Sequence, residues 1–441
     1  MLTAFSRAFK TPDLRKKLLF TLGIIVLFRL GSHVPTPNVN YTKVQACIAG
    51  ARQEGTSFLG MANLFSGGAL LQLSIFALGI MPYITASIIV QLLTVVIPKF
   101  EELKKEGQQG QVKMTQYTRY LTIALAVLQS ATFVTFARNP SQLFNNAQCT
   151  EILNSQATPS ILIMVLTMTA GTGLIMWLGE LITDKGVGNG MSLLIFSSIV
   201  ATFPQALWAI QQRDGRWDLF FIVIILGLFV VTAVVFVEQS QRRIPVQYAK
   251  RMVGRQMYGG TSTYIPIKVN MANVIPVIFA SSLLMLPVML AQFQRGQTLE
   301  DTPGWARWIE ANIAPPNSGW HIALYVGLIL FFTFFYVSIT FNPTEVADNM
   351  KKYGGFIPGI RAGRPTAEYL AYVLNRITVA GAIYLTSISL IPLVAFGYLG
   401  PAAQNIPFGG VSIIIMVGVG LETVKQIESQ LQQRHYEGFL R

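Results

Sequence analysis

Residues 58–97 read FLGMANLFSGGALLQLSIFALGIMPYITASIIVQLLTVVI and contain no charged side chain. A membrane-spanning helix needs about 20 apolar residues, so residues 73–97 predict one full span. Residues 58–70 are too short to cross and carry a Gly-Gly break. Such backbone is tolerated at membrane depth only where protein or a water-filled cavity surrounds it. The stretch therefore predicts a membrane protein with a re-entrant element beside a span, next to a cavity that opens on the outer side.

Composition extends this conclusion to all 441 residues, of which 52% are hydrophobic and only 12% charged. Ordinary globular chains carry about 25% charged residues, so a soluble enzyme, a disordered chain and a disulfide scaffold are excluded. The two cysteines and three histidines have no ligand-like spacing, and we expect no metal and no cofactor. Cys47 and Cys149 both fall in predicted outer loops, where a disulfide is conceivable, but their spacing carries no information about distance.

Uncharged runs predict ten spans. They are residues 73–97, 120–137, 159–179, 186–212, 219–237, 269–294 and 322–344, and a helical hairpin over 377–421 broken at PAAQNIPFGG (401–410); the apolar segment 18–34, which Arg29 interrupts, completes the ten. With the N-terminus in the cytoplasm, 24 of the 33 Lys and Arg face inward and 7 outward, as the positive-inside rule requires. Both termini are therefore expected in the cytoplasm. Five spans in each half, 1–212 and 213–441, raise the possibility of an inverted repeat.

The middles of the predicted spans hold almost no ionisable groups. A secondary transporter for a small solute, the main alternative, would place polar or charged ligands near the midplane. An intramembrane enzyme would need a nucleophile and a base at that depth. Neither pattern is present, so we expect no catalytic residue. Arg29, inside the first span, is expected to extend its charge to the interface or to pair with an acid at a helix end.

Two predicted cytoplasmic loops, about 238–268 and 342–372, are long and basic and also contain apolar residues. The positive-inside bias and anionic lipid account for some of the charge. Loops of this size also suit docking to RNA phosphates or an acidic protein face. The basic residues are Arg242, Arg243, Lys250, Arg251, Arg255, Lys351, Lys352, Arg361 and Arg364.

Eight motifs along the chain resemble the SecY family, the central channel subunits of the bacterial Sec protein translocon. They are NLFSGGAL (63–70), SIFALGIMPYITASIIVQLLTVV (74–96), KKEGQQG (104–110), QYTRY (116–120), MWLGELITDKGVGNGMSLLIF (176–196), QRRIPVQYAKR (241–251), KVNMANVIPVIFASS (268–282) and GGFIPGIR (354–361). The resemblance implies an all-α polytopic membrane protein whose ten helices form two five-helix halves around an hourglass pore, closed by a re-entrant plug helix.

The resemblance also assigns roles to residues. It places the plug at about 58–70, with Phe58, Leu59, Met61, Asn63, Leu64, Phe65, Ser66, Gly67 and Gly68. It places an apolar pore ring on Ile80, Ile84, Met191, Ile195, Ile278 and Ile415. The family has Ile at these positions, so Met191 departs from the pattern while keeping the ring apolar and flexible. A lateral gate is expected between the spans at about 73–97 and 270–292, where Pro82 and Pro276 are expected to make bending cheaper.

The implied function is translocation of unfolded secretory polypeptides across the bacterial plasma membrane and lateral insertion of membrane proteins into it, without enzymatic activity. The implied partners are SecE, SecG, the motor ATPase SecA, the ribosome, signal-bearing precursor polypeptides and membrane lipids. Because no nucleotide-binding motif is recognisable, the energy is expected to come from a partner. SecA or the ribosome is expected to dock on the two basic loops, with Arg255 and Arg361 as contact residues.

Overall fold

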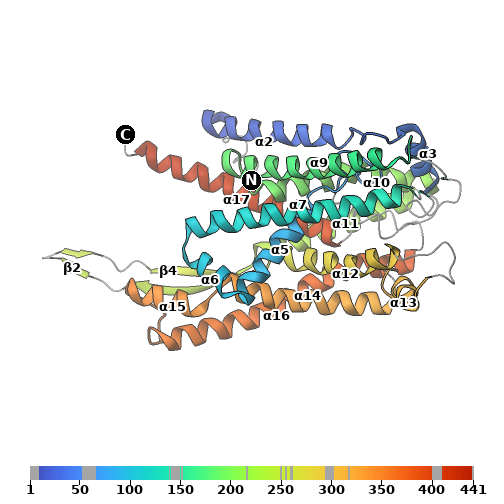
Figure 1. Ribbon diagram of the computed structural model, residues 1–441. Helices are drawn as coiled ribbons and strands as arrows, with labels where there is room; N and C mark the ends of the chain where they lie inside the picture. The colour runs from blue at the N-terminus through green and yellow to red at the C-terminus, as the bar shows by residue number, and fades with distance from the viewer. Residues whose placement is uncertain are drawn as a thin grey trace.

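The computed structural model describes residues 9–51, 66–138, 140, 149, 152–214, 217–248, 251–253, 256–258, 262–293, 302–315, 318–399 and 410–439. Its long helices run side by side (Figure 1). The helices are α2 (Pro12–Gly31), α3 (Tyr41–Ala51), α5 (Met81–Val96), α6 (Pro98–Lys105), α7 (Gln108–Arg138), α9 (Thr158–Lys185), α10 (Gly190–Asp214), α11 (Trp217–Gln239), α12 (Ile275–Phe293), α13 (Gly304–Asn312), α14 (Gly319–Thr340), α15 (Pro343–Lys352), α16 (Arg364–Leu399) and α17 (Gly410–Phe439).

Each predicted span overlaps a helix, although the number of membrane crossings stays a prediction. Among the described residues, four helical stretches are long and apolar enough to cross a bilayer: Thr158–Lys185, Phe220–Gln239, Gly319–Lys352 and Arg364–Ile391. Helices α5 and α6 pass the same test together but meet at a bend of 100°. Helix α11 leaves large side chains such as Phe229 exposed, and a bilayer would cover them.

The second predicted span is partly wrong, because its helix begins only at Met81 and residues 66–80 form turns. Gly79 takes a positive φ of 56°, which helices do not use. Pro82 lies in the first turn of α5 and Pro276 is the second residue of α12. Proline removes no hydrogen bond in a first turn, so the expected bending at these two prolines is also wrong. Pro287, by contrast, lies inside α12.

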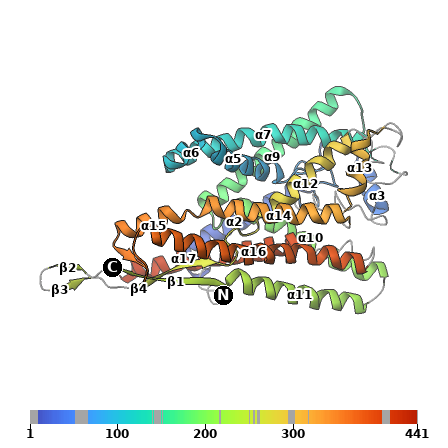
Figure 2. The ribbon, with the colours of Figure 1, turned by 90° about the horizontal axis from the view of Figure 1, so that it is seen from below.

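The elements between the long helices gather at two opposite ends (Figures 1 and 2). Helices α3 and α13 lie at one end, and α6, α15 and the strands lie at the other. The strands are β1 (Gln241–Tyr248), β2 (Arg251–Val253), β3 (Gln256–Tyr258), β4 (Ser262–Lys268) and β5 (Gly355–Phe356). This partition agrees with the predicted alternation of loops, and the short strands lie in two of those loops of a chain that is otherwise mostly helical.

The sheet joins the two basic loops. Strand β1 pairs antiparallel with β4, Gln241 opposite Lys268, and on its other edge with β5, Gln247 opposite Phe356. Strands β2 and β3 form a separate two-stranded ribbon that projects beyond the helix ends (Figure 2). Apolar residues of β1 and β4, including Ile244 and Ile267, pack with residues of α14, α15 and α16. The sheet is therefore anchored on the ends of the long helices.

At the opposite end, α3 is bonded covalently to the segment before α9. Cys47 and Cys149 form a disulfide, with their Cα atoms 5.7 Å apart. Both cysteines lie in an apolar cluster with Val44, Ile152 and Met164. The disulfide that the sequence left open is thus present in the structure.

Candidate functional site

All six residues of the predicted pore ring meet in one apolar cluster. Ile80, Met191, Ile195, Ile278 and Ile415 are buried members, and the half-buried Ile84 packs against them. They come from the start of α5, from α10, from α12 and from α17. Ile80 is the cap residue before α5 and its carbonyl accepts the Ile84 amide at 3.1 Å, whereas Met191 and Ile195 share a face of α10. The cluster therefore joins helices that lie far apart in the sequence.

Spacing alone does not select these six residues, because many isoleucines in this chain lie on membrane helices. Their common feature in the structure is convergence at the middle of the bundle rather than exposure on its rim. Ile415 is 1% exposed, whereas Ile225 on α11 is 69% exposed. Ile24 and Phe28 of α2 and Phe76 belong to the same cluster, although no pattern in the sequence singled them out.

A second apolar cluster lies where α5 meets α12. Ile88, Phe279 and Phe332 form its buried centre, and Ile84, Leu92, Ile275 and Leu328 pack against it. The rings of Phe279 and Phe332 meet edge to face, with centroids 5.4 Å apart. Residues 84, 88 and 92 follow a four-residue period, as do 275 and 279. That periodic signal is present in the sequence and could have identified this seam between the expected gate helices.

Of the predicted plug, the structure describes the last residues. Phe58, Leu59, Met61, Asn63, Leu64 and Phe65 lie outside the described residues. Ser66 is buried, and its hydroxyl oxygen accepts a hydrogen bond from the Leu70 amide at 3.0 Å. Gly67 and Gly68 both have positive φ, 68° and 91°, which favours glycine. The Gly-Gly break therefore forms a turn beside the pore cluster.

The predicted docking residues lie at the end of the molecule that carries the sheet. Arg242 and Arg243 on β1, and Lys351, Lys352, Arg361 and Arg364 in the second loop, are exposed. The Arg243 guanidinium lies over the Tyr264 ring, 4.9 Å from its centroid. Arg364 Nε donates to Glu368 at 3.0 Å. Arg251 lies on β2, whereas Lys250 and Arg255 lie outside the described residues.

Buried polar contacts fasten the segment between β4 and α12 to the end of α11. Asn270 Nδ2 donates to the Glu238 carboxylate at 2.7 Å, and the Val269 amide donates to Ser240 O at 3.1 Å. Only six residues separate β4 from α12. A cavity of about 270 Å³ beside this junction is lined by Glu238, Lys268, Asn273, Gly418, Leu421, Glu422, Lys425, Gln426 and Ser429.

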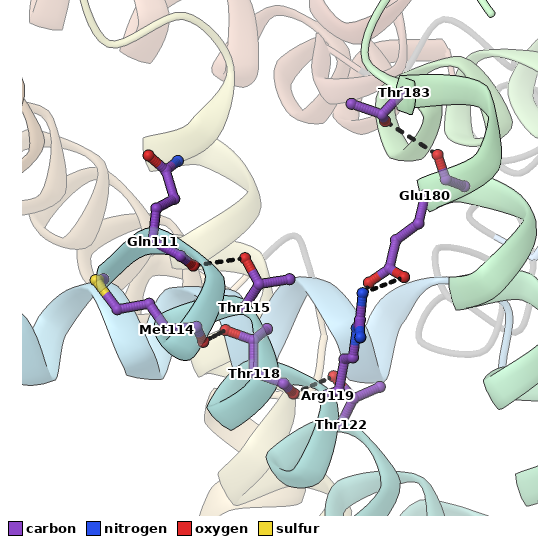
Figure 3. A network of polar contacts seen from close by, with 9 residues as sticks. Gln111, Met114, Thr115, Thr118, Arg119, Thr122, Glu180 and Thr183 are labelled. Carbon is purple, nitrogen blue, oxygen red and sulfur yellow. Dashed lines mark hydrogen bonds and ion pairs between the residues drawn. The ribbon is translucent and has the colours of Figure 1, made fainter. Parts of the chain in front are cut away.

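An ion pair that sequence reasoning missed ties α7 to α9 (Figure 3). Arg119 donates to both carboxylate oxygens of Glu180, each at 2.8 Å. These hydrogen bonds raise the pKa of Arg119 above its ordinary value. The bidentate geometry fixes orientation as well as distance. The two residues are 61 positions apart, so no local pattern pairs them.

Known proteins resemble the chain over nearly its whole length. The SecY family model matches residues 74–424. A protein translocase subunit SecY of Streptomyces scabiei is 65% identical, and one of Mycobacterium tuberculosis is 56% identical, with all of this chain and all of each relative covered.

Solved structures share the fold. One titled "The structure of a protein conducting channel" gives a TM-score of 0.62 at 18% identity, covering 94% of this chain and 91% of that one. A canine Sec61 from a ribosome-channel complex gives a TM-score of 0.59 at 17% identity, with the same coverage. Because the bacterial relatives align with the chain over their full length at high identity, and because the family model matches most of the chain, the chain belongs to the SecY family.

Proposed function

We propose that the chain is the pore-forming subunit of a protein-conducting channel, which passes unfolded secretory polypeptides across the membrane and releases apolar segments sideways into it. The observation that supports this proposal most strongly is that six apolar residues meet in one central cluster: Ile80, Ile84, Met191, Ile195, Ile278 and Ile415. The full-length relatives named protein translocase subunit SecY support the same function. The chain acts as a conduit and not as an enzyme.

The six-residue ring seals the resting pore. Branched apolar side chains exclude water, and a constriction without water blocks ions by dewetting. Such side chains contact a passing polypeptide without specific bonds, so they yield around many sequences. Met191, unbranched and flexible, maintains contact as the ring widens. The plug at 58–70 adds a second barrier on the outer side of the ring.

The seam between α5 and α12 is the lateral gate. Its contacts are apolar, with Ile88 facing Phe279 and Phe332. An apolar seam loses little when a signal sequence or membrane span replaces one side of it, because lipid and protein surfaces of this kind are equally apolar. Segments with enough hydrophobic surface therefore leave the pore through this seam.

The basic end of the molecule docks the partner that supplies energy. Strand β5 brings the loop with Lys351, Lys352 and Arg361 next to the hairpin with Arg242 and Arg243. Exposed basic residues brought together in this way fit ribosomal RNA phosphates or an acidic face of the motor SecA. SecE and SecG complete the channel.

This basic end faces the cytoplasm of a bacterial cell, and both termini lie on that side of the plasma membrane. The excess of Lys and Arg at this end supports the orientation. The Cys47–Cys149 disulfide at the other end supports it independently, because disulfides persist in oxidising compartments outside the cytoplasm.

The test is photocrosslinking in proteoliposomes that contain the full chain, SecE and SecG. A photoreactive amino acid replaces Ile84 in one variant and Phe221, an exposed residue of α11, in the control. SecA then drives a signal-bearing precursor whose folded C-terminal domain stalls it. Crosslinks from position 84 to the mature part of the precursor, absent from position 221, are the expected result.

Two other outcomes of this experiment would lead to different conclusions. Protected precursor without a crosslink at position 84 would reject the ring and leave the channel function standing. Failure of translocation with intact partners would reject the channel itself and favour the small-solute transporter. That alternative predicts uptake of a small solute that depends on polar groups in the middles of the spans.

A further inference from the structure

Arg29 carries a charge inside α2, two residues before the helix ends at Gly31. A guanidinium at membrane depth is costly unless its donors find acceptors. It was expected to reach the interface or an acid. In the structure its side chain is half-buried and Nη1 donates to the backbone carbonyl of Gly67 at 3.1 Å. The acceptor therefore belongs to the end of the predicted plug.

Gly67 is held closely between two helices. A Cβ atom at this position would overlap Arg29 Nη1 and would lie 3.1 Å from Cβ and 3.2 Å from Cα of Ser198 on α10. Its φ of 68° also disfavours any side chain. Ser198 is fully buried and lies one turn beyond Ile195 of the pore ring. The Arg29 bond thus holds the plug end against the helix that carries part of the ring.

The chain after Gly67 has other attachments that do not involve Arg29. The Thr36 hydroxyl donates to Leu73 O at 2.6 Å, and the Ile75 amide donates to Val34 O at 2.9 Å. Phe28 and Phe76 stack with ring centroids 5.8 Å apart. Loss of the guanidinium therefore releases Gly67 without detaching residues 73–76.

From this geometry we infer that Arg29 is a positioning residue for the plug, holding its C-terminal end on α10 in the resting channel, so that plug displacement breaks the Arg29–Gly67 bond. This inference rests on the proposed channel function. A hydrogen bond from a charged donor is stronger than one between neutral groups. Its loss raises the open-to-closed ratio of the resting channel roughly tenfold or more.

The test measures resting ion leak and precursor translocation in proteoliposomes that contain the full chain with SecE and SecG. Arg29→Leu removes the donor, and Gly67→Ala displaces the guanidinium from the other side. Arg376→Leu is the matched control, because Arg376 is a second arginine within a predicted span and its guanidinium lies over the Tyr372 ring, remote in sequence from the plug. Both Arg29→Leu and Gly67→Ala are expected to leak about tenfold more than the parent, with Arg29→Lys intermediate and Arg376→Leu unchanged.

A purely structural role of Arg29 predicts a different result. Arg29→Leu would then lower the melting temperature, while the leak of the folded fraction and of Gly67→Ala would match the parent, and this would overturn the inference. Equal leak from Arg29→Leu and Arg376→Leu would also overturn it. Absence of translocation by the parent protein would instead reject the proposed function, so the two failures are distinguishable.

Discussion

Replacement of Ile278 by Asn tests the apolar seal most directly. The Ile278 side chain is only 6% exposed and lies in the central cluster with Ile195 and Ile415. An amide buried there without partners costs about 1–3 kcal/mol, whereas the open pore hydrates it. The closed state therefore loses that amount relative to the open state, and the open-to-closed ratio rises about 5- to 150-fold.

The assay is single-channel conductance in planar bilayers, with the full chain and its partner subunits but without precursor. Ile278→Leu is the conservative control and is expected to stay closed. Ile329→Asn introduces the same amide at a fully buried position of α14 that packs in another cluster; it is expected to lower stability without raising conductance. The reasoning would be refuted if Ile278→Asn channels melted at the parent temperature and showed no conductance. It would also be refuted if Ile329→Asn channels conducted as much as Ile278→Asn channels.

Three further predictions concern the rest of the molecule. Cys149→Ser removes a disulfide between residues 102 positions apart and is expected to lower the free energy of unfolding by up to about 5 kcal/mol, measured by thermal melting. Alkylation of both cysteines in intact cells without a reductant would contradict the presence of this disulfide. Arg119→Gln is expected to lower the free energy of unfolding by only about 1 kcal/mol, because Arg119 and Glu180 are partly exposed. A double variant that exchanges the two charges is expected to restore the melting temperature. Arg361→Ala is expected to weaken partner binding and flatten its salt dependence, whereas Arg307→Ala, on α13 at the other end, should leave both unchanged.

Periodicity and charge located the helices in the sequence, but they did not locate the first residue of every helix. Residues 73–80 are as apolar as the helix that follows, so hydropathy cannot separate turns from helix there. The break depends on conformation: Leu73 and Gly79 adopt positive φ, and residues 73–75 bond to the chain just after α2. Such bonds between distant segments leave no trace in a window of apolar residues.

The residues of the candidate site, like the helices, could be predicted from the sequence only in part. Four-residue spacing puts Ile80 with Ile84 and Met191 with Ile195, but only the family resemblance chose these among many isoleucines. The sheet was missed because β1 and β4 are short segments whose pairing depends on partners across the loop. Arg29 had a plausible partner in any acid at a helix end, and the observed carbonyl of Gly67 has no sequence signature.

The pairing of β1 with both β4 and β5 gives mechanical stiffness to the end of the molecule that carries the sheet. A load on the hairpin is shared at once with α15 and α16, since β5 belongs to the loop between them. The Asn270–Glu238 and Val269–Ser240 bonds fasten the six-residue link between β4 and α12 to the end of α11, so a load on β4 also reaches α11. A force applied to the hairpin is therefore spread over the ends of α11, α15 and α16 instead of bending the hairpin alone.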